Sequence, residues 1–157
     1  MDVTSDAAGF GRQEVQAGDL VIVNYTGYLA PGEVFDSTIG EGKVYRDGGL
    51  GVSRPLQVRV GGDPVPGIVP GFSQGILGMR IGGRRTFVVP PELGFGGQAV
   101  LGPYAVIPAN STLRYEVELV RLSRSGPDNL TSGISRCGAG GAGQQSEGCG
   151  RITYAEF

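Results

Sequence analysis

Histidine and tryptophan are absent from the 157 residues of this chain, and cysteine occurs only twice. A histidine-based catalytic triad and a structural zinc site are therefore not expected. The sequence also lacks a nucleophile elbow, a Walker motif and a dinucleotide-binding fingerprint. We accordingly predict neither a metal nor a cofactor.

The chain also lacks a large net charge of either sign, since its formal net charge is only −2. This balance gives no reason to expect a nucleic-acid partner. The apolar runs are far shorter than the roughly 20 residues of a membrane helix, so the chain is not expected to span a membrane. Its first residues match neither a signal peptide nor an arginine-rich presequence, which leaves a cytoplasmic protein or one whose targeting segment has been removed.

Glycine and proline are abundant, at 30 and 10 residues, and many of them lie between residues 40 and 110, where they would serve turns. The length is that of about one domain. Alternating or β-branched apolar residues predict strands at residues 20–26, 33–36, 56–60, 84–89 and 113–119.

One helix is predicted, because Phe72, Ile76 and Met79 recur at helical spacing behind Pro70. The pair Gly82-Gly83 would end it. The resulting fold class is α+β, in which a strongly twisted antiparallel β-sheet wraps around one short α-helix.

Two segments do not fit this regular pattern. A glycine-rich insertion at residues 38–54 contains Tyr45, and a loop of that length inside a compact domain is usually functional or mobile. Residues 123–157 form a low-complexity, glycine-rich C-terminal extension that cannot by itself bury enough apolar area to become ordered. The aromatic residues near its end could dock on a partner.

The extension contains both cysteines, Cys137 and Cys149. In a reducing compartment they would be free thiols without a structural role. In an oxidising compartment they would form a disulfide worth about 3 kcal/mol of chain entropy. We favour the disulfide, because two cysteines confined to a flexible segment have little other structural use.

Aromatic and apolar residues recur near turns across the first 120 or so residues, which predicts an apolar pocket assembled from distant strands and loops. Such a pocket suits an uncharged peptide segment. The alternative is that these residues are ordinary core. Six motifs occur in order along this part of the chain, and the family that they resemble decides between the two readings in favour of the pocket. They are VNYTGYL at residues 23–29, GEVFDS at 32–37, VPGF at 69–72, GILGM at 75–79, VPPELGFG at 89–96 and IPANSTL at 107–113.

These motifs resemble the FKBP immunophilins, the peptidyl-prolyl cis-trans isomerases that bind tacrolimus. The insertion and the sequence GIVP at residues 67–70 are most similar to plastid members targeted to the thylakoid lumen. The resemblance implies a proline-containing polypeptide as substrate. It also implies a set of catalytic residues, namely Tyr25, Phe35, Asp36, Val69, Phe72, Phe95, Ile107 and Tyr115, and a substrate-binding set of Leu56, Ile68 and Val106.

The chain departs from the best-studied family members at two of these positions. They carry tryptophan where Phe72 stands, and tyrosine where Phe95 stands, whose hydroxyl donates to bound ligand. A smaller ring costs about 1 kcal/mol of apolar contact, and a lost donor costs roughly 0.5–1.5 kcal/mol. We therefore expect an isomerase weakened by about one to two orders of magnitude.

The predicted organisation is an FKBP-type domain at residues 1–122 followed by a partner-binding extension at 123–157. The predicted function is prolyl isomerisation in protein folding or assembly. The alternative function is that of a non-catalytic accessory or assembly subunit of a larger complex, with a photosynthetic membrane complex as one candidate. The thylakoid lumen is the expected compartment if the plastid resemblance holds, and the cytoplasm is the alternative.

Overall fold

The computed structural model describes residues 1–40, 42–131 and 153–157. The elements follow one another in the order β1 (Asp2–Ala7), β2 (Leu20–Leu29), β3 (Val34–Ser37), β4 (Leu56–Arg59), α1 (Pro70–Ile76), β5 (Arg84–Val89), the 3-10 helix η1 (Pro91–Leu93), β6 (Val100–Leu101), β7 (Val106–Ile107), β8 (Leu113–Ser123), α2 (Pro127–Thr131) and β9 (Ala155–Glu156).

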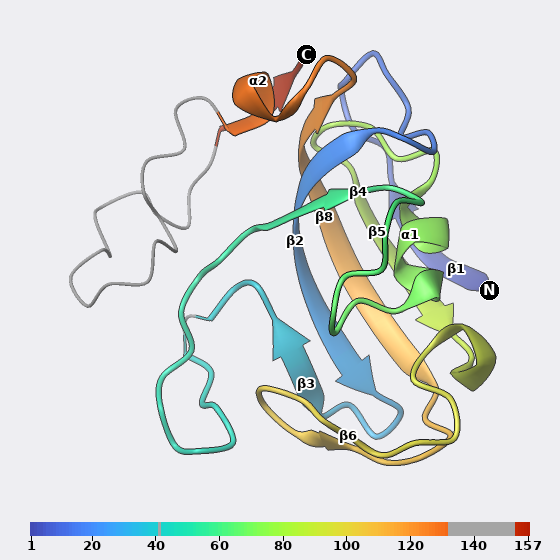
Figure 1. Cartoon of the computed structure of the whole chain (residues 1–157), viewed down its shortest axis with the longest axis vertical. Coiled ribbons are helices and arrows are strands. Elements are labelled where there is room, and N and C mark those ends of the chain that lie inside the picture. Colours follow the sequence, from blue (N-terminus) through green and yellow to red (C-terminus); the bar gives the residue numbers. More distant parts are fainter. Residues whose placement is uncertain (41, 132–152) are drawn as a thin grey trace.

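In the described part of the chain, seven strands form one sheet. Five of them follow the order β1-β5-β8-β2-β3, while β4 pairs with β2 and β9 with β8. The long strands β2 and β8 pair along their length at its centre (Figure 1). The opposite edge of β2 is shared by two short strands, since β4 pairs with its first residues and β3 with its last. The chain between β3 and β4 therefore leaves the sheet, and it carries the insertion to one side of the molecule (Figure 1).

Burial along β8 shows which face of the sheet carries the core. Leu113, Tyr115 and Val117 are buried, whereas Arg114 and Glu116 between them are exposed. This is the alternation of a strand with one apolar face. Residues 119–123 are all buried.

A second, smaller cluster lies near the start of β2. Leu130 of α2 is fully buried there with Leu20 and Ile22. The neighbouring residues Val21 and Val23 belong to the main core, so β2 is covered on both faces at this end. The chain after residue 122 thus contributes contacts to the domain.

Helix α1 lies against β5 and buries one face, which includes Phe72 and Ile76. Gly75 allows the close approach, because a Cβ there would lie 2.3 Å from the ring of Phe87. The helix is shorter than predicted, since it ends at Ile76 and not near Gly82. Gly78 has a φ of 84°, a left-handed conformation that turns the chain away from the helix axis.

The predicted α+β architecture is confirmed. Each predicted strand is present, and β5 has the predicted limits. No helix among the described residues is long and apolar enough to cross a membrane. Cys137 and Cys149 lie outside the described residues, so their disulfide stays a prediction.

Candidate functional site

A cavity of about 340 Å³ lies between the β2–β3 pair and the insertion. Three residues of the predicted site line it, namely Tyr25, Asp36 and Leu56. Tyr25 comes from the middle of β2, Asp36 from β3 and Leu56 from the start of β4. The sharing of the β2 edge by β3 and β4 is what brings these three side chains together.

Tyr25 and Asp36 form the polar centre of this cavity. The Tyr25 hydroxyl donates a hydrogen bond of 2.5 Å to Asp36 Oδ2. The backbone around Tyr25 is fixed by Thr38, whose Oγ1 accepts from the Tyr25 N–H at 2.8 Å and whose N–H donates to the Tyr25 carbonyl at 2.9 Å. The cavity therefore presents a carboxylate and a phenol in a held geometry.

Burial shifts the titration of both groups. It raises the pKa of the Asp36 carboxyl, and hydrogen bonds from Tyr25 and from the Ser37 backbone only partly oppose this effect. Burial also raises the pKa of Tyr25 far above its usual range, and the neighbouring Asp36 charge adds to the shift. Tyr25 is therefore a neutral hydrogen-bond donor at any physiological pH.

A packed group of rings lies beneath Tyr25. The Phe72 ring is 5.1 Å from the Tyr25 ring and 5.3 Å from the Tyr115 ring, centroid to centroid. Phe35 lies 5.8 Å from Tyr115 and meets Phe95 at 6.3 Å. Most of these contacts are edge-to-face, the arrangement that aromatic rings prefer. The rings of Phe72 and Tyr115 thus pack directly against the ring of Tyr25.

The remaining predicted residues differ in their exposure. Phe35, Val69, Phe72, Ile107 and Tyr115 are all buried in the core and are not among the residues that line the cavity. Ile68 and Phe95 are half-buried and pack against the core, and Val106 is 49 % exposed. Tyr25, Asp36 and Leu56 thus line the cavity together. Most of the other predicted aromatic residues are buried in the core and do not line it.

The opposite wall consists of residues that the motifs did not indicate. Tyr45, Val52 and Arg54 come from the segment between β3 and β4, and Pro103 and Tyr104 come from the loop between β6 and β7. Burial raises the pKa of Tyr104 to about 12, with the neighbouring Tyr45 phenol as the next cause. The one available signal was the length and glycine content of the insertion, which indicated a functional loop without indicating its contacts.

The described residues contain no group of three or more histidine, cysteine, aspartate or glutamate side chains that could hold a metal ion. The cavity lining combines three tyrosine rings, two prolines and two aliphatic side chains with one carboxylate, one guanidinium and a few uncharged polar groups. Its aromatic faces offer a large apolar contact area beside these polar groups.

Similar proteins point in the same direction. Residues 11–120 match the family model of the FKBP-type peptidyl-prolyl cis-trans isomerases. "FK506-binding protein 2" of Yarrowia lipolytica is 40% identical over 114 residues, which cover 73% of this chain and 67% of that protein. "FK506-binding protein 1A" of Neurospora crassa is 39% identical over 112 residues, which cover 71% of this chain and 79% of that protein.

Two solved structures share the fold. FkpA from Escherichia coli matches with a TM-score of 0.56 and 31% identity, over 79% of this chain and 47% of its own. The three FKBP domains of wheat FKBP73 match with a TM-score of 0.59 and 26% identity, over 77% of this chain and 44% of theirs. The match thus spans about half the length of these two structures. The chain belongs to the FKBP-type peptidyl-prolyl cis-trans isomerases, the family and the enzyme class that its motifs predict.

Proposed function

We propose that this chain isomerises Xaa–Pro bonds of polypeptides in the cavity beside Tyr25 and Asp36. The observation that carries the proposal is the hydrogen-bonded pair of these two residues in the wall of a cavity of about 340 Å³. A peptide laid along this cavity would place its prolyl ring against Tyr25 and Leu56.

The chemistry needs no nucleophile. Rotation about an Xaa–Pro bond is slow because twisting it removes amide resonance, at a barrier of about 18–20 kcal/mol. The twisted amide has less charge separation than the planar one, so a largely apolar enclosure favours it relative to water. An acceleration of about five orders of magnitude requires roughly 7 kcal/mol of preferential binding to the twisted form.

Asp36 and Tyr25 have distinct tasks in this scheme. The Tyr25 hydroxyl holds the carboxylate at 2.5 Å, so the carboxylate keeps one orientation while the substrate turns. A fixed group of this kind stabilises the twisted amide without the cost of reorienting solvent. The proposal therefore predicts that the pair acts as a unit.

A protease-coupled or NMR exchange assay on an Xaa-Pro peptide tests the function. Asp36→Val should remove most of the turnover, because it deletes the carboxylate from the cavity wall. Asp63→Val is the matched control, since Asp63 is exposed on the connection between β4 and α1. Wild-type turnover no faster than buffer would refute the proposed activity.

We further propose that the activity is weaker than that of family members with tryptophan and tyrosine at the positions of Phe72 and Phe95. Phe95 is half-buried, and its ring is nearly perpendicular to that of Phe35. Phe95→Tyr should raise kcat/KM by up to about tenfold if the missing donor limits catalysis. An unchanged or lower rate would show that the donor is not limiting.

The accessory-subunit role, a partner held through residues 123–157 and a thylakoid location remain predictions from the sequence. The relatives reported above lend no support to the plastid resemblance. Co-purification of the full chain with a large complex, followed by cell fractionation, would test all three. Recovery as a free protein in the cytoplasm would contradict them.

A further inference from the structure

The last described residues of the chain extend the sheet at the end of β8. Strand β5 pairs with β8 from Leu113 to Glu118 and then ends. Beyond that point β9 pairs with β8 in parallel, with Arg121 opposite Ala155 and Leu122 opposite Glu156. The Phe157 N–H adds a hydrogen bond of 2.9 Å to the Leu122 carbonyl. Residues 153–157 thus occupy a strand edge that β5 leaves open.

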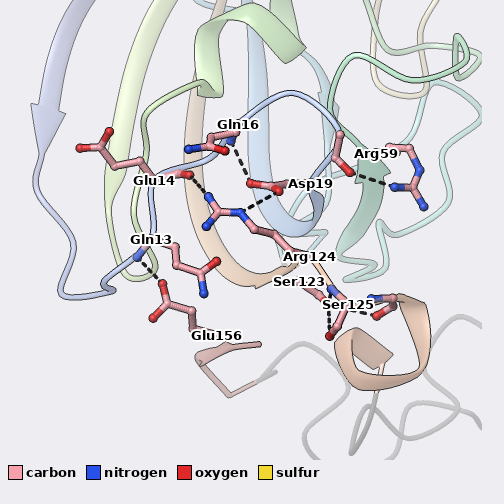
Figure 2. A network of polar contacts seen from close by, with 11 residues as sticks. Gln13, Glu14, Gln16, Asp19, Arg59, Ser123, Arg124, Ser125 and Glu156 are labelled. Carbon is pink, nitrogen blue, oxygen red and sulfur yellow. Dashed lines mark hydrogen bonds and ion pairs between the residues drawn. The ribbon is translucent and has the colours of Figure 1, made fainter.

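The Glu156 carboxylate is bound by two successive backbone N–H groups. The N–H of Arg12 donates to Oε2 at 3.1 Å. The N–H of Gln13 donates to Oε1 at 2.5 Å (Figure 2). Adjacent backbone donors that point at one carboxylate form a small anion site, and hydrogen bonds to a charged acceptor are stronger than neutral ones.

The loop that carries these donors is held by contacts that do not involve residues 153–157. The N–H groups of Phe10 and Gly11 both donate to the Ile81 carbonyl, at 2.9 and 3.2 Å. Further along, Arg124 donates to Asp19 Oδ1 at 3.1 Å and to the Glu14 carbonyl at 2.8 Å (Figure 2). The anion site is therefore built by the domain itself.

The side chain of Arg121 also binds residues 153–157 at this strand edge. Arg121 is only 4 % exposed, and its Nε donates to the Thr153 carbonyl at 2.9 Å while an Nη donates to Thr153 Oγ1 at 2.8 Å. Its other Nη donates to the Leu130 carbonyl at 2.9 Å, which ties α2 to the same guanidinium. A buried guanidinium needs such acceptors, because burying a charge without partners is costly.

An aromatic contact lies at the same strand edge. Tyr154 lies edge-on to Phe10 with 5.3 Å between ring centroids, and its hydroxyl donates to Glu118 at 2.6 Å. Phe10 is 70 % exposed even with this contact. Removing the Tyr154 side chain would therefore expose more of the Phe10 ring to solvent.

We propose that this edge is a recognition site for an extended acidic peptide, and that residues 153–157 are its ligand in cis. The edge site consists of β8 at residues 121–122, the backbone of residues 12–13 and the side chains of Arg121 and Phe10. Its ligand carries an aromatic side chain followed, two positions later, by a carboxylate. The proposal is independent of the isomerase activity.

Hydrogen exchange on the full chain tests the edge site. The amides of Arg12, Gln13 and Phe157 should be protected in the wild type. Glu156→Gln should speed exchange at Arg12 and Gln13 by about tenfold, because a charged acceptor is lost while the side chain keeps its length. Glu33→Gln is the control, since Glu33 is an exposed carboxylate between β2 and β3.

Recognition is then tested by rescue in trans. An acetylated pentapeptide with the sequence of residues 153–157, added at millimolar concentration to the Glu156→Gln chain, should restore protection at Arg12 and Gln13. The same peptide with Gln at its fourth position should fail to do so. Unprotected amides in the wild type, or no rescue by the Glu peptide, would overturn the proposal.

Discussion

The ring of Tyr45 lies against the ring of Tyr104, with 4.9 Å between the centroids and 36° between the planes. This contact joins the insertion to the loop between β6 and β7. Two hydrogen bonds support it, from the Arg46 N–H to the Pro103 carbonyl at 2.9 Å and from the Val52 N–H to the Tyr45 hydroxyl at 3.1 Å. The insertion therefore forms a wall of the cavity, and its position depends on a close fit to the opposite loop.

Gly51→Ala should disturb this fit. A Cβ on Gly51 would lie 2.3 Å from the Tyr104 hydroxyl oxygen and 2.8 Å from the backbone oxygen of Gly40. Either the insertion or Tyr104 must shift, so we expect the free energy of unfolding to fall by about 1–3 kcal/mol and kcat/KM to fall with it. Urea titration and the isomerase assay measure the two effects.

The control for this change is Gly97→Ala, where the nearest atom to an added Cβ is 3.7 Å away and the contact is ordinary. If Gly51→Ala were as stable and as active as Gly97→Ala, the wall would not depend on the close approach of the insertion.

Tyr25→Phe should impair catalysis with little effect on the fold. It removes the hydrogen bond to Asp36 while the ring keeps its contacts with Phe72 and Tyr115. We expect kcat/KM to fall about tenfold, the effect of losing one hydrogen bond to a charged group. Steady-state kinetics on an Xaa-Pro peptide gives the value.

Strand β2 supplies the matched control. Tyr28 is on the same strand, and its hydroxyl bonds Glu116 at 3.2 Å in an exposed setting. Tyr28→Phe should leave kcat/KM unchanged. Equal losses in both variants would mean that the hydroxyl of Tyr25 has no special place in the reaction.

The limits of sequence reasoning follow from how each element is stabilised. Strand β5 and the start of α1 were predictable, because their apolar periodicity and Pro70 are local signals. Strand β1 was not, since all of its residues are exposed and its pairing with β5 leaves no periodic trace. The two-residue strand β9 depends wholly on contacts with β8 and with the loop at residues 12–13.

The site divides in the same way. Tyr25 and Asp36 were identified because they lie in two of the six motifs, and Leu56 was identified through the family resemblance. Tyr104 and Arg54 were missed, because they reach the cavity only when the insertion packs on a loop far away in sequence. Phe72 was assigned to the pocket floor, and the structure places it fully buried beneath Tyr25.

Because Phe72 is fully buried, substituting it should affect the stability of the fold as well as catalysis. Phe72→Ala should lower the free energy of unfolding by about 3–5 kcal/mol, because it leaves a void among packed rings. Lost turnover in that variant would then reflect unfolding as much as catalysis. Phe72→Leu is a milder test and should keep the fold while lowering kcat/KM. Thermal unfolding measured together with steady-state kinetics separates the loss of stability from the loss of catalysis. An unaltered melting temperature in Phe72→Ala would contradict full burial.

The raised pKa of Asp36 makes a prediction about stability and pH. Burial raises the pKa of this carboxyl in the folded state above its ordinary value of 3.8. The folded chain therefore holds the proton more tightly than the unfolded chain does. The resulting contribution to stability is fully present below about pH 3.8 and is lost as the pH rises through the folded-state pKa.

Urea unfolding of the wild type and of Asp36→Asn between about pH 3 and pH 7 measures this contribution. The free energy of unfolding of the wild type, relative to that of the variant, should decrease with rising pH and then level off. Asp63→Asn controls for the loss of an exposed carboxylate. A relative stability that instead increased with pH would mean that the hydrogen bond from Tyr25 outweighs burial, because a lowered folded-state pKa reverses the sign of the linkage.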